Sequence, residues 1–235
     1  MMDKDFLVHA LTVFGVRPPF HVELLEKYYD RVMEVNKVMN LTSIVDEREF
    51  IIKHICDSVS PLLFMDINGL KCIDIGTGAG FPGIPLKVMV PDTEMDYMES
   101  IKKKARFVKE TIEILGIDGT VYDKRAEESG HDPSLRESYD VVFSRAVSSL
   151  NVLLEYSVPL LKVGGRMVAY KGPSPEEEID SAAGALNTLS ARVESVYKYN
   201  LPESGITHSL IVIRKIAETK GLYPRPSARI SKKPL

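Results

Sequence analysis

The sequence predicts an α/β protein with a mainly parallel sheet, preceded by a helical segment. From about residue 70, short runs rich in β-forming residues alternate with helix-like segments, which is the pattern of a parallel sheet. The runs at 192–201 and 208–215 leave no room for a helix between them, so we expect them to pair antiparallel at one edge. Residues 3 to about 65 instead carry apolar residues at helical spacing.

The expected elements follow one another in a regular order. The expected strands lie at 70–76, 94–99, 119–123, 139–145, 165–172, 192–201 and 208–215. The expected helices between them lie at 83–90, 101–115, 150–161 and 175–190. We divide the chain into a helical extension (1–65), an α/β domain (66–216) and a basic tail (217–235). The tail holds three prolines without apolar periodicity, so we expect it to be disordered or ordered only against a surface.

Composition narrows the class of protein. The chain has 235 residues, 44% of them hydrophobic, which suits one sizeable domain. Its net charge of -3 means that any nucleic-acid binding must rest on local basic clusters. Cys56 and Cys72 lie in apolar surroundings and fit reduced thiols, and no apolar run approaches the roughly 20 residues of a membrane span. We therefore expect a cytoplasmic monomer without a metal site, disulfide or membrane anchor.

The stretch CIDIGTGAGFPGIPL, residues 72–86, predicts a ligand site between a strand and a helix. Glycines let a ligand approach the backbone, and the helix that follows offers free N–H groups. GAGFPG satisfies G-x-G-x-x-G, which alone is compatible with a dinucleotide pyrophosphate. Asp74 argues against that ligand, because a carboxylate at the loop would repel phosphate and attract the cationic amino-acid end of S-adenosylmethionine. Asp74, Gly76, Gly78 and Gly80 thus resemble methyltransferase motif I.

Two further strand ends offer candidate contacts to such a cofactor. Glu99 and Ser100 end the second expected strand, where an acidic residue commonly binds ribose hydroxyls. The alternative is an acid that begins the helix at 101, and NAD carries the same ribose. Ala126 and Glu127 follow the third strand, where a backbone N–H and a side chain would meet adenine, or would simply begin a helix.

The end of the fourth strand reads FSRAVSSL, residues 143–150. It lacks the (D/N/S)-P-P-(Y/F/W) turn of adenine-amino and cytosine-amino methyltransferases, and it lacks a Pro-Cys nucleophile for attack on a cytosine ring. Both chemistries are therefore disfavoured. Arg145 at this strand end would face the cofactor and the incoming substrate, or would be an ordinary surface arginine.

At this point the chain as a whole resembles a known family, the bacterial 16S ribosomal RNA guanine-N7 methyltransferases (glucose-inhibited division protein B). The resemblance rests on motifs in the family's order and spacing: NLTSI (40–44), KHICDS (53–58), IDIGTGAGFPGIPL (73–86), ES and KKARF (99–107), RAEE (125–128), SRAV (144–147), GG and YKG (164–172), and YPR with KKPL. It departs from the family at 226–231 in the tail.

The resemblance implies a class I methyltransferase fold, a Rossmann-like seven-stranded sheet whose last strand is antiparallel. It implies S-adenosylmethionine as cofactor and 16S rRNA, or the small ribosomal particle, as partner. It also implies that Gly76, Phe81, Ala126, Glu127 and Arg145 line the donor pocket.

The expected chemistry needs no essential general base, because guanine N7 already carries a lone pair. Arg145 would then position guanine O6 or a phosphate through its paired donors. Asn40, His54 and Asp57 form a second tentative catalytic group, because His54 and Asp57 are three residues apart and share a helix face. The alternative is that His54 and Asp57 only hydrogen-bond each other and a loop.

Local basic clusters are the candidate RNA contacts. The cluster residues are Lys102, Lys103, Lys104 and Arg106 at a helix start, Lys171 on the fifth strand, and Arg225, Arg229, Lys232 and Lys233 in the tail. Phosphate contact would explain lysines at a helix start, where they oppose the dipole, although a solvated charged face is the alternative. A nicotinamide-dependent reductase, a small-molecule methyltransferase and a non-catalytic RNA-binding module are the competing functions.

Overall fold

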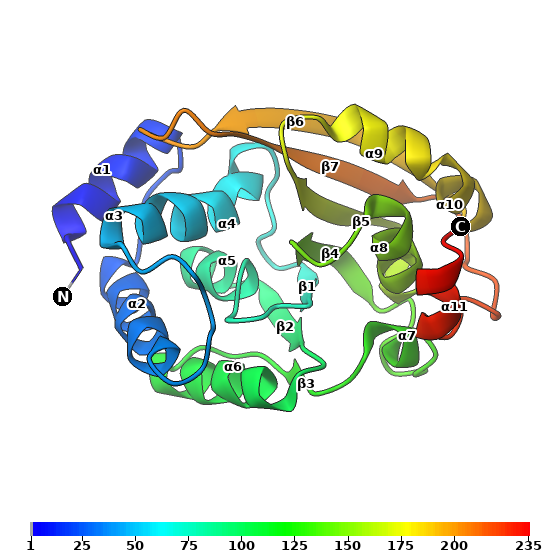
Figure 1. The fold of residues 1–235 in the computed structure, drawn as a ribbon, viewed down its shortest axis with the longest axis horizontal. Coiled ribbons are helices and arrows are strands. Elements are labelled where there is room, and N and C mark those ends of the chain that lie inside the picture. The colour runs from blue at the N-terminus through cyan, green and yellow to red at the C-terminus, as the bar shows by residue number, and fades with distance from the viewer. Residues whose placement is uncertain (1) are drawn as a thin grey trace.

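A seven-stranded sheet forms the centre of the computed structural model, which describes residues 2–235 (Figure 1). The strands are β1 (Lys71–Ile75), β2 (Glu94–Met98), β3 (Val121–Tyr122), β4 (Tyr139–Arg145), β5 (Leu161–Lys171), β6 (Ala191–Asn200) and β7 (Thr207–Lys215). Every expected strand is present, and β3 is the one whose length falls furthest below expectation.

The strand order is β3-β2-β1-β4-β5-β7-β6. The first five strands pair in parallel, and β7 runs antiparallel to both β5 and β6, which confirms the predicted antiparallel pair at one edge. The chain leaves β1 toward β2 and returns to β4 on the other side. In a sheet of this kind the connections at such a reversal diverge, which opens a crevice beside the carboxyl ends of β1 and β4.

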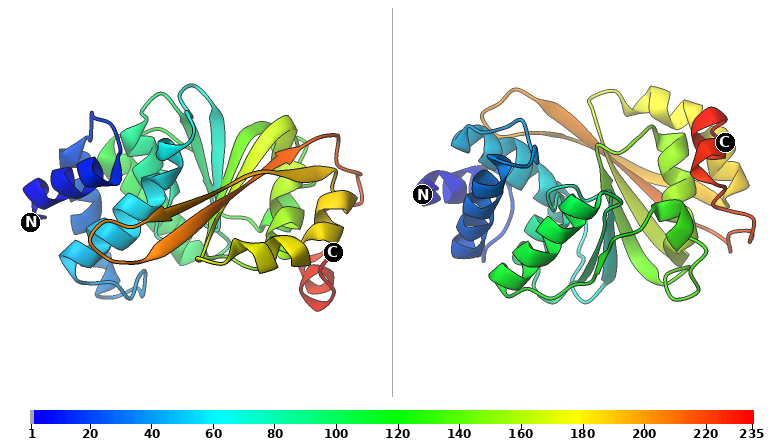
Figure 2. Two further views of the ribbon diagram at one scale, coloured as in Figure 1. Left: turned by 90° about the horizontal axis from the view of Figure 1, so that it is seen from above. Right: turned by 60° about the horizontal axis from the view of Figure 1, so that its bottom comes forward.

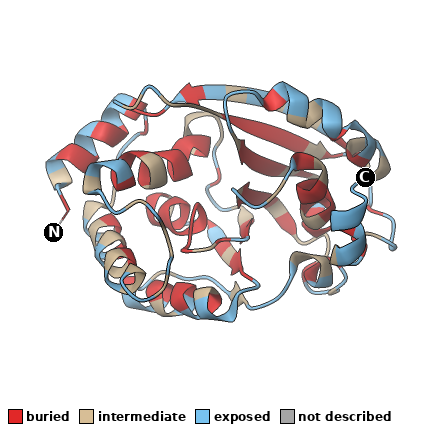
Figure 3. Ribbon diagram, in the orientation of Figure 1, coloured by how far each residue is buried: buried red, intermediate tan, exposed pale blue. Residues whose placement is uncertain are grey.

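Helices cover both faces of the sheet (Figure 2). One face packs against α5 (Gly83–Met89), α6 (Lys102–Leu115) and the N-terminal helices, and their buried side chains form one apolar core. The other face packs against α8 (Leu150–Ser157), α9 (Pro175–Ser181) and α10 (Ala183–Thr188), which form a second core. Figure 3 shows the central strands buried between these two layers. The short helix α7 (Ala126–Ser129) follows β3.

The N-terminal helices include a π-helical turn, which lies above the crevice. They are α1 (Lys4–Phe14), α2 (Val22–Asn36), α3 (Glu47–Phe50), the π-helix η1 (Ile51–Cys56), α4 (Asp57–Val59) and the 3₁₀-helix η2 (Ser60–Leu63). The run from α3 to η2 is continuous, and a π-turn in such a run often marks a functional site. The loop that precedes α3 is held by Asn36, whose side-chain oxygen accepts from the backbone N–H groups of Leu41 and Thr42.

The tail is ordered against the rest of the protein, which is the second of the two states expected from its sequence. Its helix α11 (Ser227–Lys232) packs beside α8 and α7 (Figure 1). Arg225 anchors it, because the guanidinium of Arg225 donates to both carboxylate oxygens of the fully buried Glu155 at 2.7 and 2.6 Å. The backbone N–H of Arg225 donates to the same carboxylate at 2.8 Å.

Candidate active site

The glycine loop after β1 is shaped by close packing as much as by ligand access. Gly80 has a φ of 102°, and a β-carbon there would collide with the Cδ1 atom of Ile84. Gly76 also has a positive φ, 69°, and a β-carbon there would lie 2.5 Å from Cγ2 of Val147. The hydroxyl of Tyr28 donates to the Ala79 carbonyl at 2.7 Å, so the N-terminal extension fixes the loop from above.

Asp74 lies beneath this loop and not at an exposed mouth, which corrects the expected placement of its carboxylate. It is fully buried, and its Oδ2 atom accepts from the Thr77 hydroxyl at 2.6 Å and the Gly83 N–H at 2.9 Å. Among residues 2–235, nothing donates to its Oδ1 atom. Burial raises the pKa of Asp74 to about 7. A buried acceptor without a donor fits a ligand that carries an ammonium group.

Glu99 is buried at the end of β2 and supports the same loop. Its Oε2 atom accepts from the Gly78 N–H at 3.0 Å, and its Oε1 atom accepts from the Ile101 N–H at 2.8 Å. Each carboxylate oxygen can accept a second hydrogen bond. The side chain can therefore orient the loop and still accept from a pair of ribose hydroxyls.

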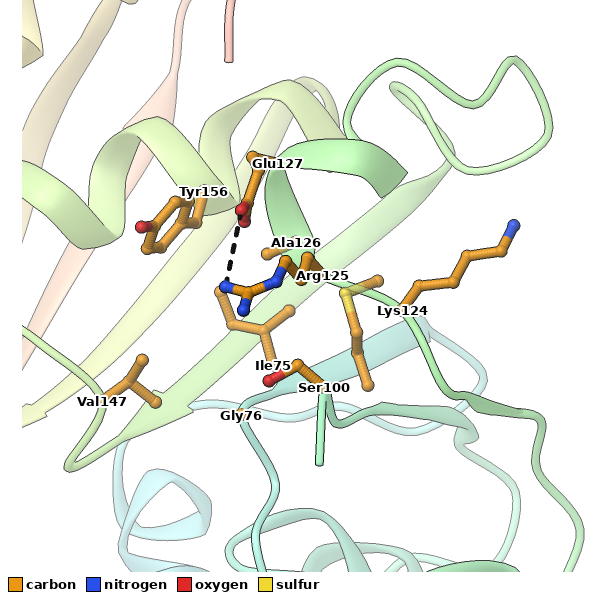
Figure 4. A pocket seen from close by; sticks show the side chains of 10 residues that line it. Ile75, Gly76, Ser100, Lys124, Arg125, Ala126, Glu127, Val147 and Tyr156 are labelled. Atoms are coloured by element: carbon orange, nitrogen blue, oxygen red, sulfur yellow. Dashed lines mark ion pairs between the residues drawn. The ribbon is translucent and has the colours of Figure 1, made fainter. Parts of the chain in front are cut away.

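A cavity of about 140 Å³, called here the donor cavity, opens between β1, β2 and α7 (Figure 4). Its lining residues are Ile75, Gly76, Met98, Ser100, Lys124, Arg125, Ala126, Glu127, Val147 and Tyr156. Four predicted cofactor residues are in this set: Gly76, Ser100, Ala126 and Glu127. The predicted residues Asp74, Gly78, Gly80, Phe81 and Glu99 form the adjoining loop and strand ends. In Figure 4, Arg125 extends across the cavity, with its Nη1 atom 3.9 Å from the Glu127 carboxylate.

Arg145, at the end of β4, joins the two tentative catalytic residues of the N-terminal run. Its Nη1 atom donates to Asp57 Oδ2 at 2.9 Å and to the Lys53 carbonyl at 3.2 Å. Its Nη2 atom lies 3.0 Å from His54 Nδ1. The guanidinium carbon lies 5.0 Å from the centre of the Phe81 ring, so the charge also rests over an aromatic face. The shared helix face of His54 and Asp57 is thus used to hold Arg145 between them.

His54 is locked in one uncharged form. Burial, and then the charge of Arg145, lower its pKa to about 3. Its Nδ1 atom accepts from Arg145, so the proton lies on Nε2, which donates to the Thr42 hydroxyl at 2.7 Å. Its ring stacks on Phe81 with centroids 4.4 Å apart. Both nitrogens are engaged, so His54 has neither a proton nor a lone pair to offer a substrate.

Asp57 is the buried hub of this network. Its Oδ1 atom accepts from the Tyr199 hydroxyl and from Nδ1 of His208, both at 2.8 Å. Burial acts to raise its pKa, but the bond from His208 and the charge of Arg145 outweigh it and hold the pKa below its usual value. Sequence reasoning missed Tyr199, His208 and Thr42, because nothing local to those positions indicates contact with Asp57 or His54 across the fold.

A second cavity of about 480 Å³, called here the acceptor cavity, lies on the other side of Arg145. Its lining residues are Ile44, Lys53, His54, Asp57, Arg145, Ala146, Ser148, Tyr170, Lys171, Gly172, Ile206 and His208. The turn after β4 separates the two cavities: Val147 lines the donor cavity, and Ala146 and Ser148 line the acceptor cavity. A donor and an acceptor molecule would thus meet across one short turn.

The remaining predicted residues divide into three groups. Asn40 is exposed, and within residues 2–235 no hydrogen bond connects it to His54, whose contact to that loop is Thr42. Arg225 is buried and paired with Glu155, so its predicted contact to RNA is wrong: the guanidinium is not at the surface. The predicted RNA-binding side chains that are at least partly exposed are Lys102, Lys103, Lys104, Arg106, Lys171, Arg229, Lys232 and Lys233. Arg106 is paired with Glu110, and Lys171 is paired with Glu178 at the acceptor cavity.

Residues 2–235 contain neither a cluster of metal-ligating side chains nor a membrane-spanning helix. No three His, Cys, Asp or Glu side chains gather as they would around a metal ion. No helix in that range combines the length and apolarity that crossing a bilayer requires.

Comparison with known proteins decides the family. The family model described as rRNA small subunit methyltransferase G matches residues 21–207. The chain belongs to this family. Ribosomal RNA small subunit methyltransferase G of Acetivibrio thermocellus is 42% identical over 99% of this chain and 96% of its own length. The protein of the same name from Caldicellulosiruptor bescii is 44% identical over 98% of this chain and 100% of its own.

Solved structures show the same fold at low identity. A SAM-dependent O-methyltransferase from Thermotoga maritima has a TM-score of 0.55 at 19% identity, covering 82% of this chain and 72% of its own. M. jannaschii TYW2 in complex with AdoMet has a TM-score of 0.53 at 16% identity, covering 74% and 80%. Membership of the methyltransferase G family confirms the expected fold class, enzyme class and methyl donor.

Proposed function

We propose that the chain transfers a methyl group from S-adenosylmethionine to N7 of a guanine in 16S ribosomal RNA of the small subunit. The observation that carries this is the pair of cavities that share the turn 145–148. The names of the relatives in the methyltransferase G family support the RNA substrate. The crevice position at the carboxyl ends of β1 and β4 supports a cofactor site.

Residues around the donor cavity have the chemistry that the cofactor requires. Bound S-adenosylmethionine supplies an electrophilic methyl group on a sulfonium. Asp74 has an unpartnered buried oxygen for the amino group, and Glu99 has free lone pairs for ribose hydroxyls. Ser100, Ala126 and Glu127 border the space left for adenine. A nicotinamide dinucleotide fits less well, because its pyrophosphate would lie at the loop that covers the buried Asp74.

The acceptor side works by positioning and not by proton transfer. The N7 lone pair needs no base, and the saturated, uncharged His54 is not available as one. Arg145 uses three of its five N–H groups on Asp57, Lys53 and His54, which leaves two donors for guanine O6 or a phosphate oxygen. Alignment of reacting groups by such fixed donors is an effective source of rate acceleration.

RNA would approach over the carboxyl edge of the sheet. Lys102, Lys103 and Lys104 project from the start of α6 beside the donor cavity, and Arg229, Lys232 and Lys233 lie on or after α11. These side chains would contact phosphates. We propose that the enzyme acts as a monomer on free 16S rRNA or on the small-subunit particle.

The test is transfer of tritiated methyl from S-adenosylmethionine to free 16S RNA and to small-subunit particles, followed by aniline cleavage at N7-methylguanosine. We expect one labelled guanine. Arg145→Lys should lower kcat about 100-fold, the scale for a misaligned reacting group, while binding of S-adenosylhomocysteine changes less than threefold. Absence of labelled RNA with both substrates, or a methyl group at another atom, would reject the proposal.

A further inference from the structure

His208, near the start of β7, borders the acceptor cavity and contacts the same carboxylate as Arg145. It lines the cavity with its side chain 32% exposed. β7 is separated from β4 by β5 alone, which places the two strands roughly 10 Å apart. The two side chains nevertheless converge on Asp57: Arg145 donates to its Oδ2 atom at 2.9 Å and His208 Nδ1 lies 2.8 Å from its Oδ1 atom, so they border the cavity next to each other.

One nitrogen of His208 is committed and the other is free. Nδ1 lies 2.8 Å from Asp57 Oδ1, and Asp57 is held as a carboxylate by its three donors, so Nδ1 carries the proton. Within residues 2–235, no group hydrogen-bonds to Nε2. In the uncharged ring, Nε2 is a hydrogen-bond acceptor fixed in direction by the bond to Asp57.

Other side chains around the cavity offer few acceptors. The two nitrogens of His54 are engaged, and Asp57 is buried, with Oδ1 accepting from Tyr199 and His208 and Oδ2 accepting from Arg145. The side chains of Lys53, Arg145 and Lys171 are donors only. Apart from the buried Asp57, the Ser148 hydroxyl and the Tyr170 hydroxyl, which donates its proton to the Ser58 carbonyl, His208 is the acceptor side chain among the residues that line this cavity.

A guanine that presents N7 to the donor cavity turns its N1–H and N2–H groups away from that cavity, and its O6 atom lies between N7 and N1. Those two donors need acceptors once they leave water. Adenine instead presents a lone pair at N1, which an acceptor would repel.

We propose that His208 selects guanine at this site by accepting a hydrogen bond from the N1–H group through Nε2. The inference rests on the proposed function and assigns a specificity-determining residue to it. His208 also supports Asp57, so its test must separate base selection from simple support of the network.

The experiment compares small-subunit particles reconstituted with guanosine, inosine or adenosine at the methylated position, once mass spectrometry has located it. Dissociation constants are measured for enzyme loaded with S-adenosylhomocysteine. Inosine keeps N1–H but lacks the 2-amino group. We expect the wild-type enzyme to bind the guanosine and inosine particles similarly and the adenosine particle roughly 5- to 100-fold more weakly, the range for an unpaired buried polar group.

In His208→Ala, the guanosine-to-adenosine ratio should fall toward one. His208→Gln, whose amide oxygen is still an acceptor, should keep most of the ratio and guards against a variant that fails to fold. Ile206→Ala, on the same hairpin and cavity, is the matched control and should weaken binding of all three particles without changing their ratio.

An unchanged guanosine-to-adenosine ratio in His208→Ala overturns the proposal. So does an equal loss for all three bases with a salt slope reduced by about one, which is the signature of a phosphate contact. Failure of the proposed function is distinct, because it would appear as absence of methyl transfer by the wild-type enzyme.

Discussion

Replacing Arg225 by methionine should destabilise the protein by removing the only counter-charge that residues 2–235 provide to a buried carboxylate. Glu155 is fully buried, and its Oε2 atom accepts from Arg225 Nη2 alone. Removing one member of such a pair costs about 3–5 kcal/mol, because the remaining charge is left buried. For a chain of this size, that corresponds to a fall in Tm of roughly 6–20 °C. Urea unfolding followed by circular dichroism measures the free energy, and calorimetry measures Tm.

A second variant tests whether the loss of stability comes from the buried charge of Glu155 or from the altered packing of the two side chains. In the double variant Glu155→Gln with Arg225→Met, the side-chain amide oxygen at position 155 can still accept from the backbone N–H of residue 225, and no charge remains buried. We expect this double variant to recover most of the loss, to within about 2 kcal/mol of wild type. Arg229→Ala, on the exposed side of the same tail, should change stability by less than about 0.5 kcal/mol. An Arg225→Met protein within 1 kcal/mol of wild type would show that this reasoning is wrong.

Four further predictions concern the site and the basic cluster at the start of α6. Burial raises the Asp74 pKa from 3.8 to about 7, so between these pH values the folded protein retains a proton that the unfolded chain loses. The free energy of unfolding, measured with urea, should therefore fall as the pH rises from about 4 to 7. Asp74→Asn should flatten this slope. Binding of the ammonium of S-adenosylhomocysteine should expel that proton, seen by calorimetry at pH 6 in buffers of different ionisation heat. The Cε1 resonance of His54 should not titrate between pH 5 and 8, because its pKa lies near 3. Replacing Lys102–Lys104 by alanine should lower the salt slope of RNA binding by about 2 to 3, whereas Lys162→Ala, paired with Asp140, should not.

The sequence was sufficient for the sheet and for most of the donor side. Short runs rich in β-forming residues, the glycine loop and the acid at the end of β2 are local patterns, and each lies within one strand and its following turn. The pairing of His54 and Asp57 with Arg145 could also be anticipated in part, because two of the three share a helix face. The spacing did not show that Arg145 is the residue that lies between His54 and Asp57.

The acceptor side was harder to predict because its contacts are long-range. Asp57 meets His208 across 151 positions and Tyr199 across 142, and neither β6 nor β7 has a pattern that points to Asp57. For Arg225 the sequence indicated a surface role that the structure does not show. A basic residue in a proline-rich tail is typical of a solvent-exposed arm, and only the fold reveals that a glutamate inside α8 requires it.

The turn that ends β4 has a consequence for how the two ligands communicate. Val147 fills the space that a β-carbon of Gly76 would need, and its neighbours Ala146 and Ser148 border the other cavity. A bound molecule that displaced this turn would move residues that line the other cavity. By linkage, any change in affinity that resulted would be the same size in both directions.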